Sequence, residues 1–183
     1  MIMEEAKLEN VVSHNIVEML TVANEYCLFV EKSSEFPPTE VIEFLLRISP
    51  LLYLKGALLP GIEPSNPEMN QHFVTEEQWE AVYSDLKVIF GQDDSIPFSP
   101  PAEESLNPFP TALSECYADV YQDLKDFVLQ FQMNTSTARE NAVWDCRILF
   151  KSRWGLRLAL GMVALHRKIF PETFQSEENS EPV

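Results

Sequence analysis

The chain has 183 residues, of which 45% are hydrophobic and 23% are charged, an ordinary composition for a soluble globular domain. This composition excludes disorder along the whole chain and allows one core without disulfide or metal staples. Thirteen basic against 29 acidic residues give a formal net charge of −16. A surface of that sign repels phosphate backbones and anionic lipid, so we expect neither nucleic acid nor a membrane as a partner.

The two ends of the chain set the expected boundaries of the domain. Residues 1–9 are acidic and lack the apolar stretch of a signal peptide, and no apolar run reaches the roughly 18 residues of a membrane span. Residues 171–183 are polar and acidic, so we expect a disordered tail there. We therefore expect a flexible N-terminus and one helical domain over residues 10–170, in the cytoplasm. Reduced core thiols are expected at Cys27, Cys116 and Cys146, whose spacing fits neither a disulfide framework nor a metal site.

Apolar residues spaced three and four apart predict helices from the beginning of this domain. The first predicted helix spans about residues 10–32. The second follows Thr39 as its N-cap and meets Pro50, where we expect either a kink or a fresh helix start with Ser49 as cap. The continuation stops at Pro60.

The clearest helix start in the chain lies at Thr75. Thr75 and Gln78 have the spacing of a capping box, and Val74 and Trp79 occupy the hydrophobic-staple positions around it. The third predicted helix ends at Gly91, because glycine suits the left-handed position after a helix.

Residues 92–112 contain five of the thirteen prolines and show no periodicity. A connection this long is uncommon inside a compact domain unless it is functional or disordered. A linker between two small domains is the alternative.

The fourth and fifth predicted helices form a hairpin. The fourth runs from Ser114, its expected cap, to about Met133, and the fifth from about Thr137 to Ile169 with a bend expected at Gly155. Their short connection makes them antiparallel neighbours. With no strand pattern in the chain, the predicted fold class is all-α, a single-domain bundle of five to six helices with a C-terminal antiparallel helical hairpin.

Acidic residues line one flank of the fourth helix, at Glu115, Asp119, Asp123 and Asp126. Like charges at this spacing repel unless opposite charges lie nearby. The hairpin register predicts three pairings, which are Asp123 near Arg147, Asp119 near Lys151, and Glu115 near Arg153 to Arg157.

Arg153 falls in the middle of the apolar stripe of the fifth helix, and Arg157 lies one turn further on. A buried guanidinium group needs carboxylate or carbonyl partners. One interpretation is an ion-pair network that fixes the hairpin register. Another is a partly open pocket that binds an anionic group, with Tyr117, Tyr121 or Trp154 nearby. A third is that Gly155 rotates the helix and exposes both arginines.

The chain lacks the sequence patterns of several common active sites. It has no glycine-rich phosphate loop, no GxSxG elbow, no HExxH and no Glu-x-x-His pair. His14 and Glu18 are four residues apart, but both lie opposite the apolar stripe, so we expect a surface pair. A metal-binding bundle would need His166 to reach the acidic flank. We expect neither a cofactor nor a metal.

Several segments resemble an uncharacterised bacterial helical family classified only as a domain of unknown function. The resemblance covers about residues 10–170 and is carried by residues 23–27 (ANEYC), 50–60 (PLLYLKGALLP), 74–77 (VTEE), 118–127 (ADVYQDLKDF) and 164–166 (ALH). It implies an all-helical, cytoplasmic protein with no assigned activity, cofactor or catalytic residue. Where the family pattern has a longer aliphatic residue, this chain has Gly56.

The leading functional hypothesis is a noncatalytic protein-interaction or regulatory module with a protein partner, which could be a homodimer. It would act through a groove beside the fourth and fifth helices or through the 92–112 loop. The alternative is a small-ligand binder or enzyme with an acid–arginine pocket. The candidate binding residues are Glu115, Asp119, Tyr121, Asp123, Arg153, Trp154 and Arg157.

Overall fold

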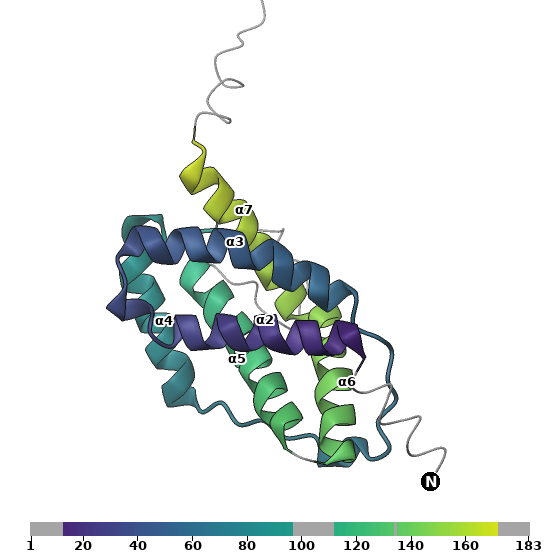
Figure 1. The fold of residues 1–183 in the computed structure, drawn as a ribbon. Coiled ribbons are helices and arrows are strands. Elements are labelled where there is room, and N and C mark those ends of the chain that lie inside the picture. The colour runs from purple at the N-terminus through teal and green to yellow at the C-terminus, as the bar shows by residue number, and fades with distance from the viewer. Residues whose placement is uncertain (1–12, 97–111, 134, 172–183) are drawn as a thin grey trace, which may run out of the picture.

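A computed structural model of the protein describes residues 13–96, 112–133 and 135–171, and within these ranges it contains helices and no strand (Figure 1). The α-helices are α2 (His14–Val30), α3 (Pro38–Ala57), α4 (Glu76–Phe90), α5 (Leu113–Gln132), α6 (Ser136–Ser152) and α7 (Trp154–Ile169). Three short 3-10 helices are η1 (Ser33–Glu35), η2 (Pro67–Met69) and η3 (Gly91–Asp93). The predicted all-α bundle is confirmed. The predicted flexible N-terminus and acidic tail lie outside the described residues, apart from residue 171.

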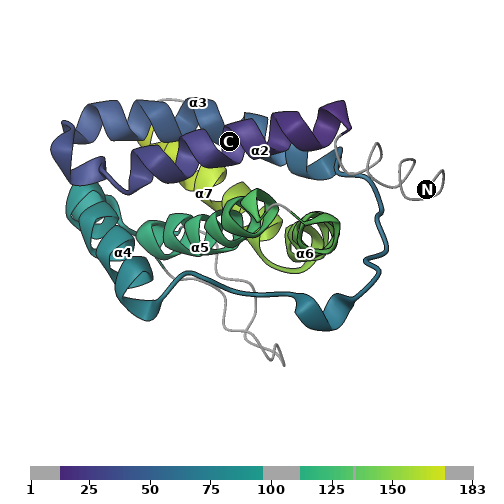
Figure 2. The same cartoon turned by 60° about the horizontal axis from the view of Figure 1, so that its bottom comes forward.

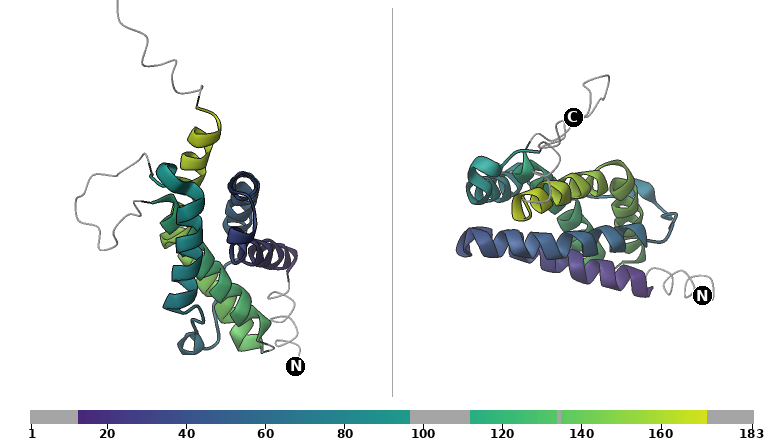
Figure 3. Two further views of the ribbon diagram at one scale, coloured as in Figure 1. Left: turned by 90° about the vertical axis from the view of Figure 1, so that its left-hand side faces the viewer. Right: turned by 90° about the horizontal axis from the view of Figure 1, so that it is seen from above.

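The helices form two layers, with α2 and α3 side by side across a layer that contains α4, α5, α6 and α7 (Figure 2 and Figure 3). Helix α5 is the central element, because it packs against α2, α4, α6 and α7. Fifteen of its 20 residues are buried, including three aspartates. The structure therefore has to supply partners for charged groups deep in its own framework.

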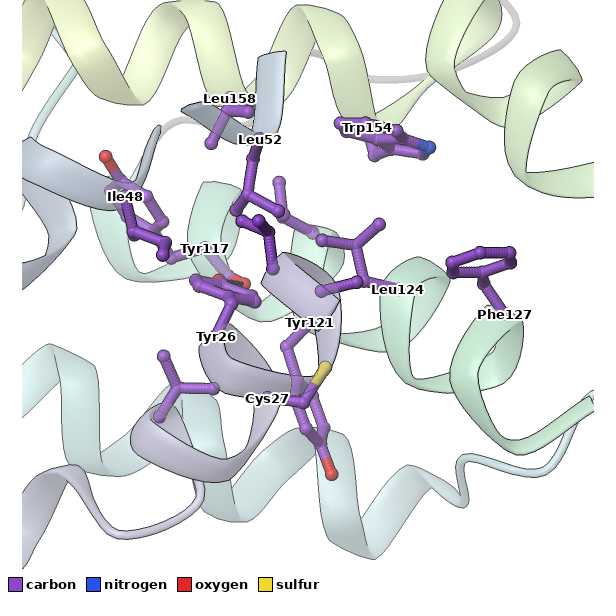
Figure 4. Packing of buried hydrophobic residues seen from close by; sticks show 14 of the residues in the cluster. Tyr26, Cys27, Ile48, Leu52, Tyr117, Tyr121, Leu124, Phe127, Trp154 and Leu158 are labelled. Atoms are coloured by element: carbon purple, nitrogen blue, oxygen red, sulfur yellow. Dashed lines mark hydrogen bonds between the residues drawn. The ribbon is translucent and has the colours of Figure 1, made fainter. Parts of the chain in front are cut away.

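The core between the layers combines aliphatic and aromatic side chains, and two of its tyrosines form buried hydrogen bonds (Figure 4). The Tyr26 hydroxyl donates to the Tyr117 carbonyl at 2.7 Å, and the Tyr117 hydroxyl lies 3.1 Å from Ser49 Oγ. Ser49 Oγ in turn donates to the Leu45 carbonyl. These bonds satisfy two buried tyrosines, so both can fill the core without an unpaired hydroxyl.

Helix α3 excludes the fresh start, one of the two alternatives expected at Ser49 and Pro50, and corrects the predicted cap. The helix begins at Pro38 and continues through Pro50 to Ala57, so it neither restarts at Ser49 nor uses Thr39 as its cap. Proline suits the first helical turn, whose N–H groups have no partner within the helix. Pro50 is tolerated in the interior because the buried face of α3, which includes Leu45, Ile48 and Leu52, packs into the core on both sides of it.

Helix α4 follows its predicted signals. Thr75 and Gln78 form the capping box, with each side chain bonded to the other residue's backbone N–H, and Gly91 has a φ of +56° after the last turn. Helix α5 differs from its prediction. It starts at Leu113 with Ala112 as N-cap, and Ser114 is not the cap, because its N–H and hydroxyl both donate to Asp94 at 2.7 Å.

The predicted 92–112 loop is described only at its ends. Residues 92 and 93 belong to η3, so the connection begins at residue 94 instead of residue 92, and residue 112 is the N-cap of α5. Residues 97–111 lie outside the described residues.

The predicted long fifth helix is two helices, and the break lies at Arg153 instead of Gly155. Arg153 has φ −141° and ψ −83°, which ends α6 and precedes α7. The space beside Gly155 is filled by the ring and the carbonyl of Phe150, which a Cβ at residue 155 would overlap. Glycine therefore permits a close approach between the two helices, while the chain itself turns two residues earlier. Helices α5 and α6 are neighbours, as predicted.

Candidate functional site

Four charged side chains meet where α5 packs against the α6–α7 break, and we call them the acid–arginine cluster. They are Asp119, Asp123, Arg153 and Arg157. Both aspartates come from the acidic flank of α5 and are almost fully buried, with 6% and 4% of their surface exposed. The arginines come from the break itself and from the first turn of α7. The sequence therefore predicted the elements that meet here.

Each charge in the cluster has an opposite charge beside it. Arg153 Nη1 lies 3.1 Å from Asp123 Oδ1, and Arg153 Nη2 lies 3.6 Å from Asp119 Oδ1. Arg157 Nε pairs with Asp119 Oδ2. Two neutral groups complete the arrangement, since Trp79 Nε1 donates to Asp119 at 3.1 Å and Arg153 donates to Gln122 at 2.8 Å. Charges paired and hydrogen-bonded in this way can remain buried.

The ion pairs of Asp119 and Asp123 differ from those that the hairpin register predicted. Arg147 donates to the Leu59 carbonyl at 3.2 Å instead of approaching Asp123, and Lys151 is exposed. The bases that reach the acidic flank belong to the break and to α7, because the chain changes direction at Arg153. Glu115 is half-buried on the same flank, one turn before Asp119.

Two predicted site residues point elsewhere. The Tyr121 hydroxyl donates to Glu31, the C-cap of α2, at 2.9 Å, and Trp154 Nε1 donates to the Cys146 carbonyl at 3.0 Å within the core (Figure 4). Tyr121 is two residues from Asp119, which places their side chains about 200° apart around α5. Neither aromatic residue belongs to the cluster, and Tyr117 is also turned into the core toward Ser49.

Asp123 is a member of the cluster whose hydrogen bonds are incomplete. Burial raises the pKa of Asp123 to about 7, while the nearby Arg153 lowers it and Asp119 raises it. Its Oδ2 atom is buried and has no hydrogen-bond partner among the residues that the structure describes. Desolvation therefore outweighs the attraction of the guanidinium group at this carboxyl.

The last acid of the flank, Asp126, lies outside the acid–arginine cluster and binds the segment before α4. Its Oδ1 accepts hydrogen bonds from the backbone N–H groups of Phe73 and Val74 at 2.6 and 2.9 Å, and its Oδ2 lies 3.0 Å from His72 Nδ1. Asp126 thereby fixes the connection that leads into α4. The spacing of acids on this flank predicted an acid at residue 126. It did not predict its partners, because every residue type except proline has a backbone N–H group and no sequence pattern indicates which of them will bind.

Side chains of helix α6 bind an earlier part of the same connection, at residues 65 and 66. Glu140 accepts from the Ser65 N–H at 2.8 Å, and Asn141 donates to the Asn66 carbonyl at 2.9 Å. Both side chains are buried. Sequence reasoning missed them, and their polarity at inward-facing helix positions was the signal that could have found them.

A hollow on α4 and another between α4 and Tyr121 have linings that do not include a member of the cluster. One of about 460 Å³ lies along the outside of α4, and one of about 170 Å³ lies between Glu31, Asp85 and Tyr121. Within the described ranges, no three His, Cys, Asp or Glu side chains group as metal ligands. The His14–Glu18 pair lies on the surface as predicted, at 3.3 Å with His14 86% exposed. No helix in those ranges has the length and apolarity needed to cross a membrane.

The fold and the cluster together define an all-helical protein whose buried charges are paired across a helix junction. The chain belongs to the family described as a domain of unknown function, DUF5063, whose family model matches residues 10–170. Its fold is also similar to a solved crystal structure, that of protein BF1032 from Bacteroides fragilis. That comparison gives a TM-score of 0.75 and 31% sequence identity, and covers 87% of this chain and 97% of the other. No curated protein matches the chain.

Proposed function

We propose that this protein is a noncatalytic protein-interaction module in which the acid–arginine cluster is structural. The observation that carries the proposal is the mutual pairing of Asp119, Asp123, Arg153 and Arg157 across the α5–α7 contact. An active site or an anion site would need at least one of these groups turned toward a substrate. Here the guanidinium groups are directed at the carboxylates of their own chain.

The outer surface supports the interaction role. Large exposed apolar side chains include Leu51 and Leu54 on α3, Leu58 just after it, and Leu156 and Val163 on α7, and others lie on α2, α4 and α6. Contiguous exposed apolar surface is typical of sites that bind other proteins. The three cysteines are free and buried, which supports a reducing compartment such as the cytoplasm.

Site-specific photo-cross-linking in the native cells tests this proposal. A benzoylphenylalanine placed at Leu54 or Val163 should give a discrete adduct with another protein, which mass spectrometry identifies and purified components reproduce. The same group at Val88, an 82% exposed apolar residue on α4, is the matched control and should give none. Adducts absent at both test positions would contradict an interaction role.

The alternative, a small-ligand site at the cluster, has one observation in its favour. The Oδ2 of Asp123 has no hydrogen-bond partner in the described part of the chain, and burial raises the pKa of this carboxyl, as at many binding sites. If such a ligand exists, a metabolite library should raise the melting temperature of the protein, and Asp123→Asn should abolish that shift. Unaltered cross-linking in the same variant would then separate the two functions.

A further inference from the structure

The segment between α3 and α4 crosses the outside of the helical layer, and we call residues 60–74 the strap. Figure 2 shows it running past α5 and α6 on the side away from α2 and α3, and its short helix η2 packs against α6. None of residues 60–74 is buried. Its apolar contacts with the core come from Ile62 and Val74, which are only partly buried. The strap therefore lacks the fully buried side chains that anchor the α-helices.

Polar side chains of α5 and α6 bind the strap through its backbone. The hydrogen bonds join Glu140 and Asn141 to residues 65 and 66, and Asp126 to residues 73 and 74. Each of these three side chains is at most 5% exposed. Contact with the strap thus removes two carboxylates and a carboxamide from water, and hydrogen bonds to backbone groups replace the lost hydration.

The contact between the strap and the helices is incompletely paired. Asn141 Oδ1 and Asn70 Oδ1 are buried and have no hydrogen-bond partner in the described part of the chain, and the same holds for Gln130 Nε2. Gln130 lies one turn after Asp126 on the same flank of α5. A buried polar atom without a partner has lost its bonds to water without replacement. Opening of the strap would return such atoms to water.

Both ends of the strap are firmly attached. At the first end, Leu59 is only 4% exposed, and its carbonyl accepts from Arg147 at 3.2 Å. At the other end, Thr75 belongs to the capping box of α4, and Trp79 in the first turns of that helix donates to Asp119 at 3.1 Å. A weakly anchored stretch between two fixed ends is the arrangement of a lid.

We propose that the strap opens as one unit while the α-helices stay folded, and that its opening uncovers a polar groove between α5 and α6. The groove is lined by Asp126, Gln130, Glu140 and Asn141. Carboxylates and carboxamides bind backbone N–H and C=O groups, as three of these side chains bind the strap. This inference does not depend on the proposed function, because it concerns a movement that the fold itself allows.

Amide hydrogen exchange of the full-length chain, followed by NMR, tests the inference. The amides of residues 65, 73 and 74 should exchange about a hundredfold faster than the slowest amides of α5, after correction for intrinsic rates. Their exchange should depend little on added urea, because opening the strap exposes little apolar surface. The amide of Leu86 in α4 should stay slow, since that side chain is fully buried.

A variant that removes one contact tests whether the strap moves as a unit. Glu140→Ala deletes the acceptor of the Ser65 N–H only, yet it should speed exchange at Ser65, Phe73 and Val74 by a common factor of about ten. Glu140→Gln weakens the same bond with little change in size and replaces the alanine variant if that one does not fold. Glu68→Ala, which alters an exposed acid of the strap, is the matched control and should change the three rates by less than a factor of about two.

Three results would overturn the inference. If the strap amides exchanged only as slowly as the slowest amides of α5, the strap would open only when the whole chain unfolds. If Glu140→Ala accelerated exchange at residue 65 alone, the segment would move in independent pieces. If the amides of α4 accelerated together with those of the strap, the opening would include a helix, and the strap would not be a separate lid.

Discussion

Asp123 combines a buried carboxyl, an incomplete set of hydrogen bonds and a neighbouring guanidinium group. Arg153 Nη1 lies 3.1 Å away, yet the pKa of Asp123 is raised to about 7 because burial removes water from the ionised form. Its usual pKa in an unfolded chain is about 4. The folded protein therefore holds the proton more tightly than the unfolded chain does.

This difference predicts a pH effect of definite sign. Between about pH 4 and pH 7 the unfolded chain loses the proton first, so the contribution of Asp123 to the free energy of unfolding falls as the pH rises and is lowest above about pH 7. Urea unfolding of the wild type and Asp123→Asn at several pH values measures it. The wild type should lose stability relative to the variant as the pH rises. If the difference in unfolding free energy between the wild type and Asp123→Asn did not change with pH, the raised pKa of Asp123 would be contradicted. Glu43→Gln, a change on the surface, is the control.

The sequence predicted correctly that acidic and basic residues come together, but it did not predict which way the nearby aromatic side chains point. Acids along one flank of a helix and an arginine within an apolar stripe indicated that opposite charges must meet, and Asp119, Asp123, Arg153 and Arg157 do meet. The aromatic residues assigned to the same place do not lie there. A tyrosine can serve a core or a pocket, and only the rotation of the helix within the fold decides between them.

The junction between α6 and α7 determines which bases reach α5. Its tightest contact is at Gly155, where an added Cβ would overlap both the carbonyl and the ring of Phe150. A backbone carbonyl cannot move aside as the end of a flexible side chain can. The junction should therefore be the position in the chain least tolerant of a small increase in volume.

Gly155→Ala should lower the free energy of unfolding by about 1–3 kcal/mol, the usual cost of overpacking. Gly61→Ala is the matched control, because its Cβ would lie 3.6 Å from the guanidinium group of Arg147, an ordinary contact distance. That control should be close to neutral. Chemical denaturation of both variants measures the difference, and equal stability of the two would show that α6 and α7 do not depend on the close approach.

The sequence located a helix end correctly where the residues that determine that end are close together in the chain. The capping box at Thr75 and the positive φ of Gly91 are examples. The starts of α3 and α5 and the break at Arg153 depend on residues distant in the chain, such as Asp94 for α5. Gly56 is similar, because its missing side chain leaves space for the ring of Trp154, nearly one hundred residues later.

Across the whole molecule, three thiols report on the integrity of the core. Cys27, Cys116 and Cys146 come from α2, α5 and α6, are free and buried, and have thiol pKa values raised by burial. Thiolate is the reactive form, so these residues should be inert in the folded protein. Ellman's reagent should label them only as fast as the protein unfolds, and the rate should rise with urea. Rapid labelling of any of them under native conditions would show that the core opens locally.

The overall class of the protein could be predicted because periodicity, composition and the absence of strand patterns all agreed. The path of residues 59–75 could not be predicted, since it is held by side chains of α5 and α6 that bind backbone groups. Such contacts depend on the assembled layers. They also account for the burial of the polar residues Asp126, Glu140 and Asn141.

The account depends most on the proposition that the buried charges of α5 and α7 stabilise each other. A double-mutant cycle with Asp119→Asn, Arg157→Met and the combined variant measures this coupling by urea unfolding. We predict a coupling energy of about 1–3 kcal/mol, because each single change removes one charged partner from a group of the cluster. Single effects that add to within about 0.3 kcal/mol would show that the two groups are energetically independent, and would contradict the structural role of the cluster.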